Sequence, residues 1–223
     1  MMKYKEYEVA FSPARLNRYK NACGGDTRKT MLLYRHNLKL CQKYYGVLNI
    51  FEIILRNAID RHYRMYFNDV DWIINQIQAG GMLEHTPHKA EAMKHYNQLA
   101  KKGMYTPDKM LSAQSFGFWT YMFNKMPFNA GGKNLLDIFP SKQIGLGQKA
   151  VYNELKDIKK FRNRIAHHEP ICFDAQGNKN LAYAQANYKQ IIKYLAFLGY
   201  SEKDILYGYD VQTQELINRI MNS

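Results

Sequence analysis

The stretch QKAVYNELKDIKKFRNRIAHHEP, residues 148–170, carries the clearest folding signal in the chain. At about 100° per residue, its apolar side chains fall on one stripe of a helix. The members of this stripe are Val151, Leu155, Ile158, Phe161 and Ile165. The spacing predicts an amphipathic helix over residues 148–168, and Pro170 stops it because proline cannot continue a helix.

Helical spacing recurs through the rest of the chain, whereas strand alternation is sparse. Gly46 is expected to be a bend or a close contact between two long helices. Residues 127–147 are expected to form a loop with one helical turn near 134–139, and residues 172–180 a polar turn with a short β-like excursion. The other helices that we expect cover residues 12–20, 28–44, 47–67, 88–102, 111–126, 181–198 and 211–221. We therefore predict an all-α fold in which residues 1–223 form a single domain.

The composition is that of a globular and strongly basic protein. Of its 223 residues, 46% are apolar and 23% are charged, which argues against wholesale disorder. Lys and Arg number 32 against 19 Asp and Glu, so the formal net charge is +13. This excess predicts attraction to polyanions, with nucleic acid first and an anionic membrane surface second.

The cysteines and the hydropathy pattern predict a cytoplasmic protein. Cys23, Cys41 and Cys172 are odd in number and have no CxxC spacing, which disfavours a disulfide scaffold and a four-cysteine zinc site. The N-terminal residues 1–16 lack an apolar core of signal-peptide length. Polar residues interrupt the longest apolar stretch, residues 47–55, so we expect no membrane span.

The segment FRNRIAHHEP, residues 161–170, contains the side chains best suited to catalysis. Arg162 falls inside the apolar stripe, where a guanidinium needs an acidic partner or an anionic ligand. His167 lies about 140° around the helix from Arg162 and shares a face with Asn163. Arg162 and His167 therefore converge only if the long arginine stem swings across or if two such helices pair. These groups suit RNA cleavage, in which histidine moves protons and arginine holds the phosphate.

Each of these residues also has a structural interpretation. Arginine and histidine near a helix C-terminus commonly interact with the helix dipole or form surface salt bridges. A metal site is one interpretation of the adjacent residues His167, His168 and Glu169. However, adjacent residues of a helix point in different directions, and the sequence contains no third and fourth ligand at a suitable spacing. We therefore expect no metal and no cofactor.

Three segments together resemble one protein family. RNRIAH, residues 162–167, is an R-N-x-x-x-H hexad of the kind found in HEPN domains, and RNRIAHHEP resembles its form in Abi-like (abortive-infection) proteins. LYRHNLKLCQKYYGVLNIFEIILRNAI, residues 33–59, is similar to the helical N-terminal segment of that family and ends in its E-x-x-L-R-N pattern. SFGFWTYMF, residues 115–123, is similar to its F-G-F-W motif.

The resemblance implies a HEPN-like helical bundle with additional helices and a metal-independent endoribonuclease. Members commonly work as homodimers with two hexads facing each other, and act in phage defence or as toxins, for which an antitoxin of protein or RNA is a possible partner. Carried over to this chain, Arg162 and His167 are the catalytic pair and Asn163 is the polar residue between them. RNA is the implied substrate.

Further residues are expected to support this site. Glu52 and Arg56 are i, i+4 neighbours that favour a mutual ion pair, and Glu52 is also a candidate partner for Arg162. The candidates for binding the nucleic acid are Lys156, Lys159, Lys160, Arg164 and His168, although a solvated surface explains such charges equally well. The aromatic residues of 116–123 are expected to fill a core, with stacking on unpaired bases as the alternative.

Two other functions remain open at this point. One is a non-catalytic helical module that binds RNA or a partner through the hexad. The other is a toxin whose site an antitoxin covers, which differs in regulation and not in chemistry.

Overall fold

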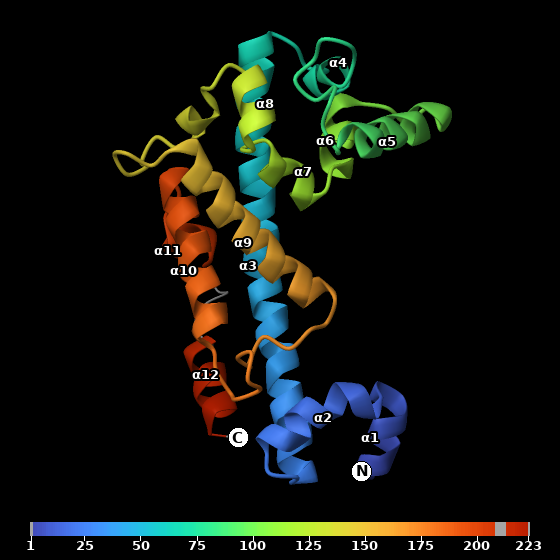
Figure 1. Cartoon of the computed structure of the whole chain (residues 1–223), viewed down its shortest axis with the longest axis vertical. Coiled ribbons are helices and arrows are strands. Elements are labelled where there is room, and N and C mark those ends of the chain that lie inside the picture. Colours follow the sequence, from blue (N-terminus) through green and yellow to red (C-terminus); the bar gives the residue numbers. More distant parts are fainter. Residues whose placement is uncertain (1, 208–212, 223) are drawn as a thin grey trace. The chain divides into compact units, whose positions relative to one another are not determined.

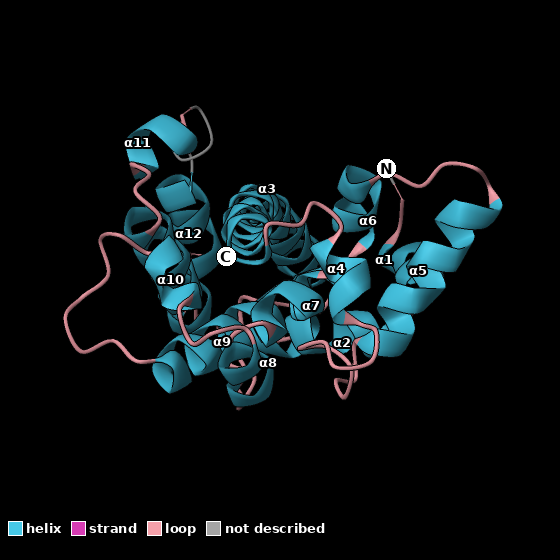
Figure 2. Cartoon of the chain, turned by 90° about the horizontal axis from the view of Figure 1, so that it is seen from above, coloured by secondary structure: helices cyan, strands magenta, loops and turns pink. Residues whose placement is uncertain are grey.

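The described part of the chain is built from helices and loops. The computed structural model describes residues 2–207 and 213–222, and no strand occurs among them (Figure 2). One isolated antiparallel bridge joins Phe173 and Lys179, at the β-like turn expected around Gly177. The predicted all-α fold is confirmed. Among the described residues, no helix combines the length and the apolar character that crossing a membrane requires.

Figure 1 labels the helices in chain order. Their bounds are α1 Tyr4–Phe11, α2 Pro13–Ala22, α3 Thr27–Phe67, α4 Trp72–Gln76, α5 Lys89–Lys101, α6 Pro107–Ala113, α7 Phe116–Tyr121, α8 Lys125–Ala130, η1 Leu135–Ile138, α9 Gln148–Ala166, α10 Ala182–Phe197, α11 Glu202–Ile205 and α12 Thr213–Met221. The element η1 is a 3₁₀ helix and matches the helical turn expected near 134–139.

The chain divides into two compact units. Unit 1 comprises Met1–Asn49, Phe161–Gln190 and Lys203–Ser223, and unit 2 comprises Ile50–Lys160 and Ile191–Glu202. The helices α3, α9 and α10 each contribute residues to both units. The single-domain assignment therefore stays a prediction.

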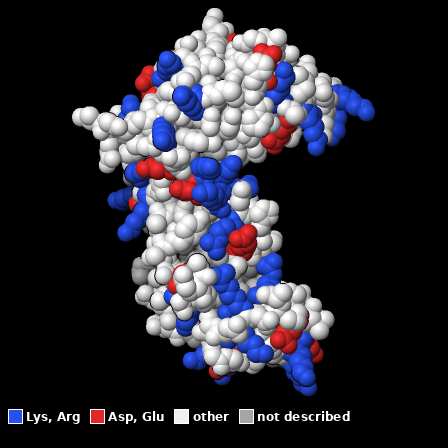
Figure 3. Space-filling model, in the orientation of Figure 1, with Lys and Arg blue, Asp and Glu red and all other residues white. Residues whose placement is uncertain are grey.

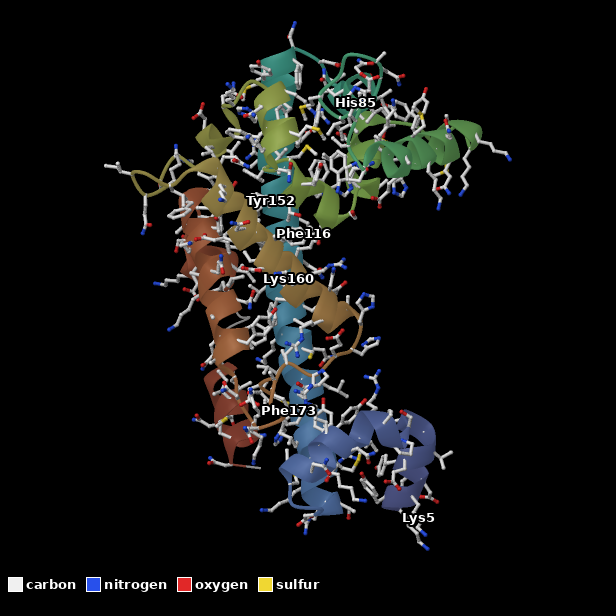
Figure 4. All side chains as sticks on the ribbon, viewed as in Figure 1. Lys5, His85, Phe116, Tyr152, Lys160 and Phe173 are labelled. Atoms are coloured by element: carbon white, nitrogen blue, oxygen red, sulfur yellow. The ribbon has the colours of Figure 1, made fainter. Side chains whose placement is uncertain are left out.

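Aromatic side chains build the interior of unit 1. Tyr19 on α2 packs edge-on against Tyr34 on α3 and Phe173, at ring-centroid distances of 5.2 and 5.1 Å. Figure 4 shows Phe173 in the loop between α9 and α10. On α9, Phe161 packs edge-on against Tyr44 and Tyr183, at 5.5 and 5.7 Å. Edge-to-face rings contribute specific geometry beyond their buried area, so these contacts fix the C-terminal end of α9 within unit 1.

The F-G-F-W segment lies in the core of unit 2. Phe116, Phe118 and Trp119 on α7 are 0 to 2% exposed, as expected for a core role. Phe116 packs against Phe51 of α3 at 6.1 Å between ring centroids. Ser115 caps this short helix by accepting a hydrogen bond from the Phe118 amide.

Several expected boundaries were wrong, and residues 127–130, which were expected to be loop, belong to α8. The helix α3 runs without a break through Gly46, because a single glycine costs a helix only about 1 kcal/mol and packing offsets it. The expected helix 111–126 is interrupted, and its residues lie in α6, α7 and α8, since Ser115 and Asn124 start new helices as N-caps. The helix α9 ends at Ala166, two residues early. The start of the expected helix 211–221, residues 211–212, lies outside the described residues.

Cys23, Cys41 and Cys172 are free thiols, as expected. Burial raises the pKa of Cys172 to about 12 and that of Cys41 to about 11, so both stay protonated near neutral pH. Because the thiolate is the nucleophile, iodoacetamide is expected to alkylate both much more slowly in the native protein than in urea. Mass spectrometry of the alkylated protein measures this. Equal rates at Cys172 in the two conditions would contradict its burial.

Candidate active site

The site begins with the buried stripe of α9. All five predicted members, from Val151 to Ile165, are at most 6% exposed, which confirms the amphipathic helix. This packing fixes the rotation of α9 about its own axis. It thereby determines which of the following residues point to solvent.

A helix-terminating turn sets the geometry at the end of α9. The amide of His168 donates to the Ile165 carbonyl at 3.0 Å, and the amide of Glu169 donates to the Arg164 carbonyl at 2.8 Å. His168 has a φ of 57°, in the left-handed region. These are the two bonds and the backbone conformation of a Schellman motif, here with histidine in the position that usually holds glycine. The motif explains why the helix ends before His167 and does not continue to residue 168.

The hexad residues differ in exposure. Asn163 and His167 are exposed, whereas Arg162 is half-buried beside the apolar stripe, as its position on the wheel predicts. The His167 amide still donates to the Asn163 carbonyl at 2.9 Å, so the two residues keep helical i, i+4 spacing. All three residues belong to unit 1. The structure thus keeps the imidazole of His167 open to solvent at a helix end.

Arg164 makes contacts that hold the turn together. Its Nη2 donates to the Pro170 carbonyl at 2.7 Å, and its Nε lies 3.4 Å from a Glu169 carboxylate oxygen. Its guanidinium carbon lies 5.1 Å from the centroid of the Tyr183 ring. These contacts give Arg164 a structural role. The sequence also makes Arg164 a candidate for binding RNA.

Arg164→Ala is expected to lower the free energy of unfolding by about 1 to 3 kcal/mol, because it removes a charged hydrogen bond and a cation–π contact. Urea denaturation measures this loss. Lys156→Ala, an exposed position on the same helix, is the matched control and should change stability by less than about 0.5 kcal/mol. Equal stability of the two variants would show that the turn does not depend on Arg164.

Side chains from α2 and α3 anchor the segment that follows the hexad. Arg15 Nη1 donates to the His168 carbonyl at 2.7 Å, and Arg18 Nη2 donates to the Asp174 carbonyl at 2.5 Å. The Asn37 side-chain oxygen accepts from the Ile171 amide at 3.0 Å. No motif or spacing in the sequence indicates these contacts, which join residues more than 130 positions apart. They position the backbone directly after His167.

An open groove of about 890 Å³ lies beside the end of α9 in unit 1, and we call it the α3 groove. Ile165, Ala166 and His168 line one side of it. Its α3 wall includes Leu32, Arg35, Leu38, Lys39 and Tyr45, and Arg219 of α12 contributes as well. Two of the six residues of the hexad therefore lie in the wall of the groove.

The other expected site residues belong to unit 2. Lys156 is exposed, and Lys160, labelled on α9 in Figure 4, pairs with Asp157 at 2.8 Å. Lys159 is half-buried. Each of these three lysines belongs to α9, so they precede the hexad along the same helix. Their contribution to RNA binding stays a prediction.

The supporting pair, Glu52 and Arg56, lies on the part of α3 that belongs to unit 2. The Arg56 Nε donates to the side-chain oxygen of the adjacent Asn57 at 3.3 Å. The ion pair between Glu52 and Arg56, and the bridge from Glu52 to Arg162, stay predictions. Figure 3 shows that Lys and Arg outnumber Asp and Glu on the face in view, in line with the net charge of +13.

The comparisons with known proteins place the chain in a family. No curated protein and no solved structure is similar enough to the chain to count as a match. Among the described residues, no group of three or more His, Cys, Asp or Glu side chains is arranged to hold a metal ion. The model of the family described as Abi-like protein matches residues 2–172, a region that includes the hexad, the segment 33–59 and the F-G-F-W segment. Because this region takes in most of the chain, the chain belongs to the Abi-like protein family.

Proposed function

We propose that this Abi-like protein is a metal-independent endoribonuclease with the R-N-x-x-x-H hexad as its active site. The observation that carries the proposal is the exposure of His167 and Asn163 at the end of α9, with the half-buried Arg162 directly before Asn163. A proton-transfer group and a cation for a phosphate thus occur together within unit 1. The basic net charge favours RNA as the partner.

The cleavage step needs no external nucleophile. The 2′-oxygen attacks the adjacent phosphorus while His167 accepts the 2′-hydroxyl proton, and the bond from phosphorus to the 5′-oxygen breaks. The departing 5′-oxygen takes up a proton from a histidine in its imidazolium form. Arg162 binds the phosphate oxygens and stabilises the charge that grows on them, and Asn163 orients the imidazole or an oxygen. The products are a 2′,3′-cyclic phosphate and a 5′-hydroxyl.

The proposal includes a homodimer. On one helix, Arg162 and His167 are about 140° apart in direction, so a second hexad facing the first would bring an arginine and a histidine to one phosphate. A dimer also supplies one histidine as base and the other as acid. The mass of the protein in solution, measured by light scattering, tests this part.

The biological role that we propose is phage defence by abortive infection, or toxicity restrained by an antitoxin of protein or RNA. Family membership supports this role. The experiment is tightly controlled expression of the wild type and of His167→Ala, with growth and total RNA integrity as readouts. Growth arrest with RNA fragmentation by the wild type alone is the expected result. Equal arrest by both proteins would contradict a role for cleavage.

One observation favours an alternative, a non-catalytic RNA-binding module. Arg164, one of the two arginines of the hexad, is bound to Pro170, Glu169 and Tyr183, so part of the hexad acts in holding the fold. Tight RNA binding without cleavage by the purified wild type would decide for this alternative.

A further inference from the structure

The α3 groove exposes apolar side chains that folding leaves uncovered. Leu32, Leu38 and Tyr45 are 45%, 39% and 38% exposed, and all three line the groove. Leu38 and Tyr45 are seven residues apart on α3, so they lie on one side of the helix, two turns apart. The exposed ring of Tyr45 is a flat surface of the kind on which a nucleobase stacks, and the leucines add apolar surface along the same groove.

The same groove is positively charged. Arg35, Lys39 and Arg219 line it, together with two histidines, and its described lining contains no Asp or Glu. Arg219 pairs with Glu215, and Arg35 Nη2 donates to the Tyr7 hydroxyl at 3.0 Å. Lys39 is exposed and has no ion pair among the described residues. The pKa of His36 is lowered, first by burial and then by Arg219 and Lys39, which indicates a positive field in the groove.

A neutral apolar ligand would not interact with the positive charges of the groove. A second copy of the chain also fits the groove poorly. In a two-fold symmetric interface each patch meets its own copy, so Arg35 and Lys39 would face like charges. A polyanion with flat apolar bases matches both features at once. Single-stranded RNA has this chemistry, whereas the paired bases of a duplex are stacked inside the helix and not free to enter a groove.

The position of the groove connects it with the hexad. Ile165 and Ala166 are hexad residues in its wall, and His168 directly follows the catalytic histidine. We propose that the α3 groove binds unpaired bases of RNA next to the scissile phosphate, with Tyr45 stacked on one base, Leu38 against a neighbouring base and Lys39 on a phosphate. This inference rests on the proposed function and specifies its substrate class, which is unpaired RNA.

Binding is tested in the full-length His167→Ala protein, so that the RNA stays intact. The probe is a short fluorescent single-stranded RNA, compared by anisotropy with the same strand annealed to its complement. Tyr45→Ala is expected to weaken single-strand binding at least about fivefold, since one base–aromatic stack contributes that much. Tyr45→Phe keeps the ring and should bind like the parent protein. The duplex should bind more weakly and respond little to either change.

The charge is tested by a matched pair of variants on α3. Lys39→Glu changes a lysine in the groove, and Lys29→Glu makes the same charge change at an exposed position outside it. Lys39→Glu is expected to weaken binding several-fold more than Lys29→Glu. Equal losses for the two, with no effect of Tyr45→Ala, would overturn the proposal in favour of nonspecific attraction.

Two further results separate this inference from the nuclease itself. Tyr45→Ala is also made in the protein that keeps His167. If this variant cuts and binds RNA like the wild type, the groove does not bind bases, and the nuclease proposal is unaffected. If the wild type cuts no RNA but binds single strands through Tyr45 and Lys39, the nuclease proposal is wrong and the proposal that the groove binds RNA is supported. Loss of a dimer in Tyr45→Ala with unchanged RNA affinity would assign the groove to a second copy and overturn the proposal.

Discussion

His167→Ala is expected to reduce the rate of RNA cleavage at least about 10²-fold, because a positioned general acid–base group contributes 10² to 10⁴. The imidazole is exposed at the end of α9 and lies off the buried stripe. Its removal therefore leaves the core intact, and the free energy of unfolding should change by less than about 0.5 kcal/mol. Initial rates on mixed RNA, with urea denaturation of the same samples, measure both effects.

The matched control is His85→Ala. The His85 side chain is 81% exposed and belongs to unit 2, whereas the hexad belongs to unit 1, so this variant removes an exposed imidazole that is not part of the hexad's unit. It should cut RNA at the wild-type rate. A similar rate loss in both variants would mean that the effect of His167→Ala is not one of catalysis.

Phe161→Ala is expected to lower the free energy of unfolding by about 3 to 5 kcal/mol, since it removes a large buried ring and leaves a cavity. Phe161 is fully buried and packs edge-on against Tyr44 and Tyr183. The neighbouring hexad residues depend on this packing for their position, so cleavage should fall together with stability. Urea denaturation followed by circular dichroism measures the loss.

Phe161→Leu serves as the graded control, because it keeps most of the buried volume and loses only the ring contacts. We expect a loss between those of the wild type and Phe161→Ala. A loss of less than about 1 kcal/mol in Phe161→Ala would contradict the buried, well-packed position of the ring.

The helices could be predicted from the sequence because their signals are local. The 3.6-residue period of residues 151–165 fixed the buried face of α9 correctly, and the density of aromatic residues placed Phe116 and Trp119 in a core. Boundaries were less predictable. Ser115 and Asn124 cap new helices inside an apolar run, and the run's apolar character alone predicts one continuous helix. Gly46 led to the opposite error. Glycine disfavours a helix, so a bend was expected at this position, but Gly46 lies inside the continuous helix α3.

The contacts that surround the hexad could not be predicted from sequence patterns. Arg15 binds the backbone at His168 across 153 residues, and Asn37 binds it at Ile171 across 134. Such contacts depend on the tertiary fold, and neither Arg15 nor Asn37 belongs to a sequence motif that predicts its hydrogen-bond partner. The left-handed backbone of His168 is equally hidden, because glycine is the usual signal for that position.

The most direct test of the central claim is the chemistry of the cut ends. Purified wild type and His167→Ala are incubated with mixed RNA in excess EDTA, and the termini of the products are identified by mass spectrometry. We predict cleavage by the wild type alone, with 2′,3′-cyclic phosphate or 3′-phosphate at one end and 5′-hydroxyl at the other. Absence of cleavage by the wild type in EDTA, or products with 3′-hydroxyl ends, would contradict a metal-independent nuclease centred on His167.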